Sequence, residues 1–335
     1  MTQPDIILDM RHISKAYAGV PALRDVSFSC VRGQVHALVG ENGAGKSTLM
    51  KILAGAVQAD SGEIVFKGRS FSHLTPRLSL DMGISIIYQE LALSPYLTVA
   101  ENIFLGREPN RAGVIQTGQM RKQAAELLER LHVHIDVDEP VSELTVAKQQ
   151  MVEIAKALSR QADLIVMDEP SAILVGEELE QLFRTIHSLV AQGVTIVYIS
   201  HRLDEVFQIA EQVTVLKDGA LVSSQARAGL TQPELVQMMV GRPLEEVYPP
   251  SPGKHGEPVL VVEGVSNKRL KDVSLTLHAG ETLGVAGMVG SGRTELARAI
   301  FGADAVSSGR ILLNGKPLTK DSPAQAIESG GALVA

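Results

Sequence analysis

The chain has 335 residues, 45% of them hydrophobic and 21% charged, which is typical of a globular protein with one large core or two modest ones. Its net charge of −7 argues against nucleic acid as a main partner, and its single cysteine excludes an intrachain disulfide. Because it has no secretory signal and no apolar run near the ~18 residues that a membrane span needs, we expect a cytosolic protein or one held at a membrane only through a partner.

The first informative element is a strand, a glycine-rich loop and a helix. Residues 35–39 predict a buried strand, and residues 49–54 the first turns of a helix. The loop between them has the pattern G-x-x-x-x-G-K-[ST], in which backbone N–H groups and the helix N-terminus face phosphates. Lys46 would reach the β- and γ-phosphates, and the Ser47 hydroxyl would bind Mg²⁺. A bare glycine-rich turn is the disfavoured alternative. The loop is Gly40, Glu41, Asn42, Gly43, Ala44, Gly45, Lys46, Ser47 and Thr48.

Three weaker signals flank this loop. Upstream, Tyr17 could stack on a base, although one aromatic residue is more often part of the packing. A predicted strand at 84–88 ends at Gln89, whose amide can bind Mg²⁺ or the attacking water. A helix at 151–158 follows Thr145, which has the position of an N-cap, so either an anion site or an ordinary capped helix fits. The segment ahead of this helix is Leu144, Thr145, Val146, Ala147 and Lys148.

Two further strands end in candidate catalytic residues. The apolar run 164–167 leads to Asp168 and Glu169, at the end of a strand where open α/β sheets bind ligands. Asp168 would hold Mg²⁺, and Glu169 would act as general base on the attacking water. The strand 194–199 delivers His201, which could contact the γ-phosphate. The alternatives are a solvated acidic turn and a strand-end histidine without a role.

The region around the phosphate loop occurs twice. Positions 23–68 recur at 270–315 with a constant offset of 247, and 15 of the 46 pairs are identical. We therefore predict a complete domain at 5–241, a proline-rich linker at 242–256 and the N-terminal part of a second domain at 257–335. The second copy stops opposite Tyr88, so it is expected to be truncated and to fold incompletely, because its parallel sheet would lack strands.

Together these motifs resemble an ATP-binding cassette (ABC) ATPase. The resemblance implies an α/β P-loop NTPase (RecA-like) fold with a parallel-sheet core, an antiparallel β subdomain, a helical signature subdomain and a partial second copy. In family terms the motifs are the A-loop (Tyr17), Walker A (40–48), Q-loop (Gln89), signature loop (144–148), Walker B (165–168), catalytic Glu169, D-loop (172–175) and H-loop (His201).

Three stretches, 97–108, 146–158 and 199–206, look like the bacterial monosaccharide importers of the ribose/galactose/xylose type. That resemblance implies an ATPase that uses ATP and Mg²⁺ and lies peripherally on the cytoplasmic face of the inner membrane. It would contact a membrane permease near Gln89–Asn102, and a periplasmic sugar-binding protein would deliver the sugar. ATP would close two cassettes head to tail, so the resemblance implies a second cassette in cis or in trans. It implies no nucleic acid partner.

Several positions depart from the family pattern. In the second Walker A, Arg293 replaces Lys and Glu295 adds a negative charge, so we expect poor ATP binding there. In the first cassette, Lys148 replaces the usual Gln of the signature, and the D-loop at 172–175 differs from its usual form.

The chain is either a fragment of a longer subunit or pairs its first cassette with that of another copy. The alternatives are a twin-cassette ATPase acting on ribosomes or DNA and a catalytically silent nucleotide-binding fragment.

Overall fold

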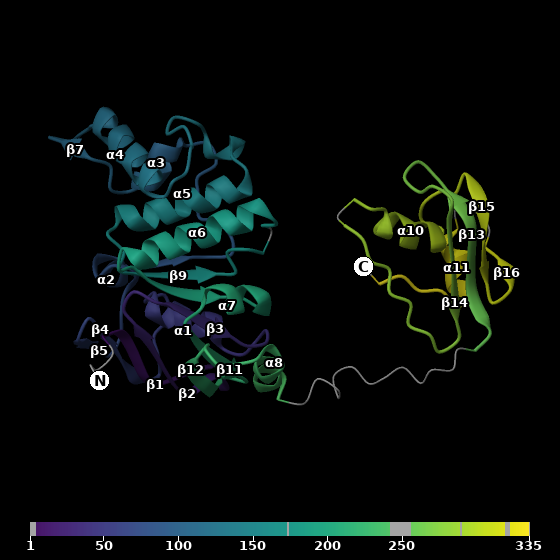
Figure 1. Cartoon of the computed structure of the whole chain (residues 1–335), viewed down its shortest axis with the longest axis horizontal. Coiled ribbons are helices and arrows are strands. Elements are labelled where there is room, and N and C mark those ends of the chain that lie inside the picture. The colour runs from purple at the N-terminus through teal and green to yellow at the C-terminus, as the bar shows by residue number, and fades with distance from the viewer. Residues whose placement is uncertain (1–4, 173, 242–255, 289, 319–321, 335) are drawn as a thin grey trace. The chain divides into compact units, whose positions relative to one another are not determined.

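The computed structural model describes residues 5–172, 174–241, 256–288, 290–318 and 322–334. The chain divides into two compact units, Met1–Val247 and Tyr248–Ala335 (Figure 1). The predicted linker at 242–256 lies outside the described residues except for Gly256. None of the helices in the described ranges is both long enough and apolar enough to cross a bilayer.

A six-stranded sheet forms the centre of the first unit, with the strand order β12-β11-β3-β10-β9-β6. All neighbouring strands run parallel except β12 beside β11. The two central strands β3 and β10 are fully buried because the sheet is covered on both faces, which explains their continuous apolar runs. The predicted strands are thereby confirmed. Their bounds are β3 (Val35–Val39), β6 (Ile84–Ile87), β9 (Leu164–Asp168), β10 (Thr195–Ile199), β11 (Gln212–Lys217) and β12 (Ala220–Ala226).

One face of this sheet packs on helix α1 (Lys46–Leu53) and an antiparallel sheet of order β2-β1-β4-β5. The core here joins Leu49 of the helix to Phe28 of the antiparallel sheet and Val197 of the central sheet, all buried. The helix therefore lies between two sheets, and its N-terminal end directly follows the loop after β3. The antiparallel strands are β1 (Ile6–Tyr17), β2 (Val20–Val31), β4 (Ser61–Phe66) and β5 (Arg69–Phe71).

Helices cover the other face of the central sheet and build a helical subdomain at the end labelled α3 and α4 in Figure 1. A reciprocal capping box starts α3: the Thr98 side chain accepts from Glu101 N, and the Glu101 carboxylate accepts from Thr98 N. The elements are α2 (Pro76–Asp81), α3 (Val99–Phe104), β7 (Asn110–Arg111), β8 (Val114–Ile115), α4 (Thr117–Arg130), a 3₁₀ turn (Val141–Glu143), α5 (Val146–Ser159), α6 (Glu177–Ala191), α7 (Leu203–Ile209) and α8 (Gln232–Val240).

The second unit repeats the start of this arrangement. Its antiparallel sheet has the order β14-β13-β15-β16, which matches β2-β1-β4-β5 of the first unit. Helices α10 and α11 begin and end 247 positions after α1 and α2. The described part of this unit contains no parallel strand pair, although the antiparallel sheet and both helices form. The bounds are β13 (Pro258–Ser266), β14 (Val273–His278), α10 (Arg293–Ile300), β15 (Ser308–Leu313), β16 (Lys316–Pro317) and α11 (Pro323–Glu328).

Candidate functional site

The loop between β3 and α1 follows a path that requires glycine at two places. A Cβ atom on Gly40 would lie 2.2 Å from the Leu216 carbonyl oxygen, and one on Gly45 would lie 2.7 Å from a methyl group of Leu23. Gly45 has φ 101° and is the N-cap of α1, a left-handed conformation that other residues rarely adopt. By contrast, nothing lies within 4 Å of the same position on Gly43, so the loop is open on that side.

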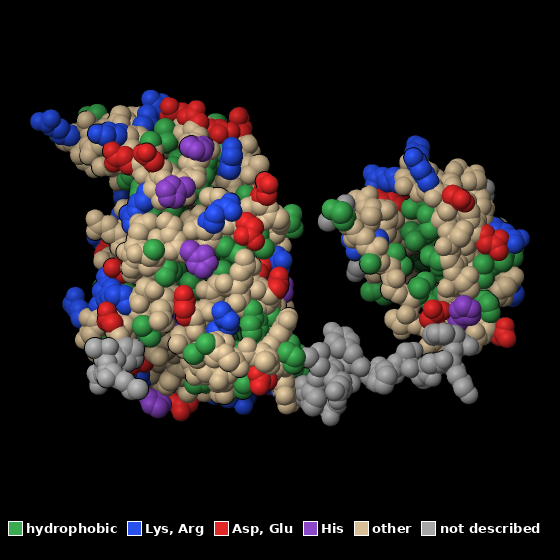
Figure 2. Space-filling view, in the orientation of Figure 1, with side chains coloured by type: hydrophobic (Ala, Val, Ile, Leu, Met, Phe, Trp, Pro, Cys, Tyr) green, Lys and Arg blue, Asp and Glu red, His purple; other side chains and the backbone are tan. Residues whose placement is uncertain are grey.

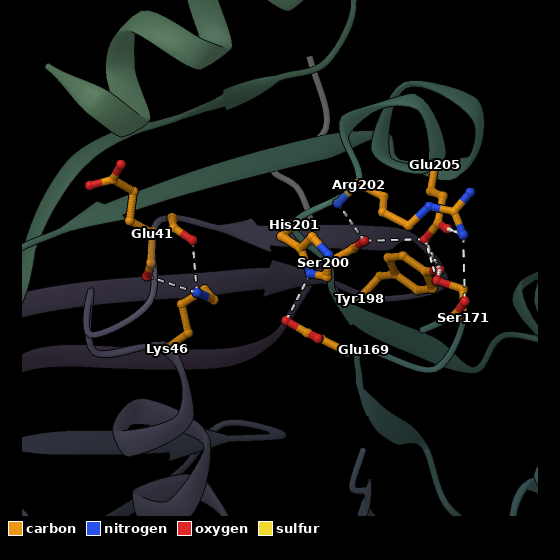
Figure 3. Close-up of polar contacts among 10 residues, drawn as sticks. Glu41, Lys46, Glu169, Ser171, Tyr198, Ser200, His201, Arg202 and Glu205 are labelled. Carbon is orange, nitrogen blue, oxygen red and sulfur yellow. Dashed lines mark hydrogen bonds and ion pairs between the residues drawn. The ribbon is translucent and has the colours of Figure 1, made fainter. Parts of the chain in front are cut away.

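Lys46 begins α1 and folds back over the loop. Its side chain is buried, and its Nζ donates hydrogen bonds to the carbonyl oxygens of Gly40 at 2.8 Å and Glu41 at 3.1 Å (Figure 3). Burial lowers the pKa of Lys46, and the charges of Glu169 and Asp168 act in the opposite direction. The ammonium group is thus held at the centre of the loop, where its donors can be transferred to an anion.

A cleft of about 390 Å³ opens over this loop. It brings together residues that lie up to 152 positions apart in the sequence, from Tyr17 to Glu169. The predicted aromatic, glutamine and acidic residues therefore share one site with the loop residues from Asn42 to Thr48, whereas Gly40 and Glu41 do not line it. The lining residues are Tyr17, Ala22, Asn42, Gly43, Ala44, Gly45, Lys46, Ser47, Thr48, Gln89, Asp168 and Glu169.

The acidic pair lies at the carboxyl end of β9, opposite the lysine. Burial raises the pKa of Asp168, and the neighbouring Glu169 adds to the rise, while Lys46 and Lys51 lower it. Glu169 has φ 49°, and its N–H donates to the Ile199 carbonyl oxygen at 2.9 Å. This bond ties the end of β9 to the end of β10, where Asp168 and Ile199 are paired in the parallel ladder.

His201 completes the constellation from the end of β10. Its Nδ1 lies 3.0 Å from Glu169 Oε1 (Figure 3), and its side chain is 60% exposed. The sequence predicted both residues at strand ends but gave no direct contact between them. The contact follows from the adjacency of β9 and β10 in the sheet.

At the other end of the cleft, Tyr17 closes β1 and is half exposed. The ammonium group of Lys15 lies 5.7 Å from the centre of its ring, and it also pairs with Asp60 at 2.7 Å. An aromatic face that borders the cleft and carries a nearby cation suits a flat, electron-rich ligand.

A comparison with protein families decides the class of this chain. The sequence model of the ABC transporter family matches residues 23–172 and again residues 270–333. The chain belongs to the ABC transporter family. The second match falls on the repeat, so both units carry the family's sequence.

Curated relatives are similar to this ABC protein along nearly its whole length. The ribose import ATP-binding protein RbsA 1 of Rubrobacter xylanophilus is 51% identical over 329 residues, which are 98% of this chain and 66% of that protein. A putative ribose/galactose/methyl galactoside import ATP-binding protein of Burkholderia lata is 47% identical over 98% of this chain and 63% of that protein. The chain therefore spans just under two thirds of the length of these relatives.

Solved ATP-binding cassettes have the fold of the first unit. A nucleotide-free cassette from an ABC transporter is 28% identical, with a TM-score of 0.63 over 71% of this chain and 100% of that chain. An ABC transporter cassette in its ADP conformation is 27% identical, with a TM-score of 0.61 over 71% of this chain and 99% of that chain. The expected P-loop NTPase fold is confirmed.

The signature loop of the ABC chain does not line the cleft. Thr145 caps α5, as predicted, by accepting a hydrogen bond from Lys148 N at 3.4 Å. Leu144 is buried, whereas Val146 is exposed, and Gln149 Nε2 fixes the turn by donating to the Leu144 carbonyl oxygen at 3.1 Å. The segment Leu144, Thr145, Val146, Ala147 and Lys148 is therefore fixed on the helical subdomain, with Thr145, Val146 and Lys148 exposed.

The second phosphate loop of the ABC chain is built differently. Gly292 caps α10 in the same left-handed conformation as Gly45, with φ 94°. Arg269 and Glu295 form an ion pair at positions that match Ala22 and Thr48 of the first cleft, and the arginine lowers the pKa of Glu295. Charged side chains thus replace small ones beside this loop.

Proposed function

We propose that the chain is the ATP-hydrolysing subunit that energises ABC-type import of a monosaccharide of the ribose or galactose type through a membrane permease. The observation that carries the proposal is the convergence of Lys46 and Glu169 in one cleft, with His201 in contact with Glu169. The names of the relatives, which are ribose and ribose/galactose/methyl galactoside import proteins, support the sugar class.

The cleft fits MgATP in size and chemistry. A volume of about 390 Å³ lies within the range of small-ligand pockets. Tyr17 would stack on the base, while Lys46 and the loop N–H groups would bind the phosphates. The donor set of Ser47, Gln89 and Asp168 consists of the hard oxygen ligands that Mg²⁺ prefers, and all three residues line this cleft. Bound Mg²⁺ would neutralise charge on the phosphates.

The chain's own residues then supply the proton chemistry. Glu169 would accept a proton from the attacking water, since it lies beside the lysine and within the cleft. His201, held by Glu169 through Nδ1, would orient that water and the γ-phosphate with the exposed edge of its ring. Both roles require a closed site that excludes bulk water.

Closure would need the signature loop of a second cassette. Since residues 144–148 lie outside the cleft of their own unit, we infer that they act on the nucleotide of another cassette, in the same subunit or in another copy. Thr145 would offer its hydroxyl and the N-terminus of α5 to the γ-phosphate. Lys148 would add a positive charge where the family usually has Gln.

The permease would dock beside the glutamine. A groove of about 220 Å³ lies between β6 and α5 and is lined in part by Tyr88, Ala92 and Arg160. Lys156 fixes its rim by donating to the Ala92 carbonyl oxygen at 2.8 Å, and Tyr96 nearby in the sequence is 90% exposed. This groove overlaps the expected contact segment Gln89–Asn102. The subunit would then lie peripherally on the cytoplasmic face of the bacterial inner membrane, with a periplasmic sugar-binding protein on the other side.

Steady-state ATP hydrolysis across a protein concentration series tests the proposal, with Glu169→Gln as the control. We expect specific activity to rise with concentration, as first cassettes of two chains pair, and to vanish in the variant. No turnover above that of Glu169→Gln at any concentration would identify the chain as a silent nucleotide-binding piece and contradict the proposed activity.

A further inference from the structure

A buried carboxylate lies behind the Glu169–His201 pair, outside the cleft. Glu205, in the first turn of α7, is 1% exposed. A carboxylate removed from water is stable only if hydrogen-bond donors and opposite charge replace the solvent. Figure 3 shows such donors converging on Glu205 from two segments of the chain.

Three hydroxyl groups donate hydrogen bonds to Glu205, and one guanidinium forms an ion pair with it. Glu205 Oε2 accepts from Ser171 Oγ at 2.5 Å, from the Tyr198 hydroxyl at 2.7 Å and from Ser200 Oγ at 3.1 Å. Its Oε1 lies 2.9 Å from Arg202 Nη1. Burial raises the pKa of Tyr198, and Glu205 adds to the rise, so the phenol keeps the proton that it donates. Bonds to an ionised acceptor are stronger than those between neutral groups.

These donors come from the two segments that carry the catalytic pair. Ser171 lies two residues after Glu169, and Ser200 directly precedes His201. Arg202 also donates to the Ser171 carbonyl oxygen at 3.5 Å and, through its N–H, to Ser200 Oγ at 3.0 Å. One carboxylate therefore joins the turn after β9 to the turn after β10.

We propose that Glu205 is a positioning residue for ATP hydrolysis, which fixes the Glu169 carboxylate and the His201 imidazole relative to each other by holding Ser171 and Ser200. It contacts neither member of the pair and acts through the two turns. The proposal rests on the proposed function of Glu169 and His201. A positioning role would also explain why a carboxylate is buried at this place. An apolar residue could pack there at a smaller cost in desolvation free energy.

The kinetic test uses Glu205→Gln, which keeps the shape of the side chain and removes its charge, and the milder Tyr198→Phe. We expect kcat for ATP to fall about 10-fold or more in Glu205→Gln with KM changed by less than about two-fold, since small misplacements of catalytic groups cost rate rather than ground-state binding. Tyr198→Phe should show a smaller fall in kcat of the same kind.

The matched control is Thr185→Val, which removes another buried hydroxyl from the same unit. Thr185 lies in α6 and donates to the Gln181 carbonyl oxygen at 2.9 Å, without contacting Glu205, Ser171 or Ser200. Its kcat should equal that of the wild type. Equal kcat values in Glu205→Gln and Thr185→Val would overturn the proposal.

Amide hydrogen exchange on the full chain separates this proposal from the proposed activity. Glu205→Gln should speed exchange at 168–172 and 199–202, where the Glu169 N–H donates to Ile199, and leave β3 and α5 unchanged. Exchange that is unchanged, or faster everywhere, would overturn the positioning role. Localised exchange in a chain without turnover would support the positioning of the two turns and contradict the proposed activity.

Discussion

The two units contain the same opening segments, but among the described residues a parallel sheet is found in the first unit alone. Val35–Val39 lies between β10 and β11 in the first unit, with all five residues buried. The equivalent residues 282–286 of the second unit do not form a strand, and Leu283 and Val285 there are 40% and 50% exposed. A central parallel strand therefore forms only when its neighbours are present. Its hydrogen-bond partners and the residues that cover its two faces lie in distant parts of the chain.

The antiparallel sheets behave in the opposite way. Each is assembled from strands that are near in sequence, so it forms in both units, with β13 pairing to β14 and β15 as β1 pairs to β2 and β4. The second unit nevertheless leaves apolar surface uncovered, and Figure 2 shows hydrophobic side chains gathered on its visible face. An apolar cavity of about 450 Å³ is lined by residues such as Leu277, Phe301 and Leu333.

The largest difference between the two units is expected when the equivalent residues Lys46 and Arg293 are each replaced by alanine. Lys46→Ala should reduce ATP turnover about 100-fold or more, because it removes a preorganised charge from the phosphates. Arg293→Ala should leave turnover within about two-fold of the wild type, since the described part of its unit has no counterpart of Asp168 and Glu169. Steady-state hydrolysis measured side by side checks both variants. A comparable loss in Arg293→Ala would show that the second loop takes part in turnover.

The next comparison concerns stability at the equivalent positions Leu49 and Leu296. Leu49 is 0% exposed and packs against both sheets, whereas Leu296 is 7% exposed and packs in a smaller cluster without a parallel sheet. Leu49→Ala should cost its unit about 3–4 kcal/mol and Leu296→Ala about 2 kcal/mol, near the lower end for leucine truncation. Amide exchange at the slowest sites of each unit of the full chain measures both costs separately. A larger cost for Leu296→Ala would contradict the difference in packing.

How much of this could be predicted from the sequence depends on the range of the interactions. The strand and helix on either side of the glycine-rich loop, the other predicted strands of the first unit and the Thr145 cap follow from local patterns and are confirmed. The Glu169–His201 contact depends on which strands are neighbours, and the Glu205 cluster on a carboxylate that the sequence presents only as a charged residue in a helix. Neither carries a local signal, because the partners lie up to 34 positions apart.

The smallest expected effect concerns why the second loop is expected to bind ATP poorly. It tests whether the residues of the loop itself or the strands that surround the first loop account for the difference. In the double variant Arg293→Lys/Glu295→Thr the second loop takes the Lys and the Thr of the first and loses the Arg269–Glu295 ion pair. We expect nucleotide binding to remain at one per chain, because Gly264 occupies the place of Tyr17 and the described part of the second unit has no counterpart of β9, the strand that carries Asp168 and Glu169.

Equilibrium binding of a fluorescent ATP analogue measures that stoichiometry, and a Lys46→Ala background isolates the second loop. Binding should be about as weak in the triple variant as in Lys46→Ala alone, since two exchanged loop residues cannot replace the stacking, metal-binding and acidic groups that surround the first loop. Recovery of a full equivalent of bound nucleotide would mean that Arg293 and Glu295 alone disable the second site. The local loop sequence, rather than the strands that surround it, would then account for the difference between the two units.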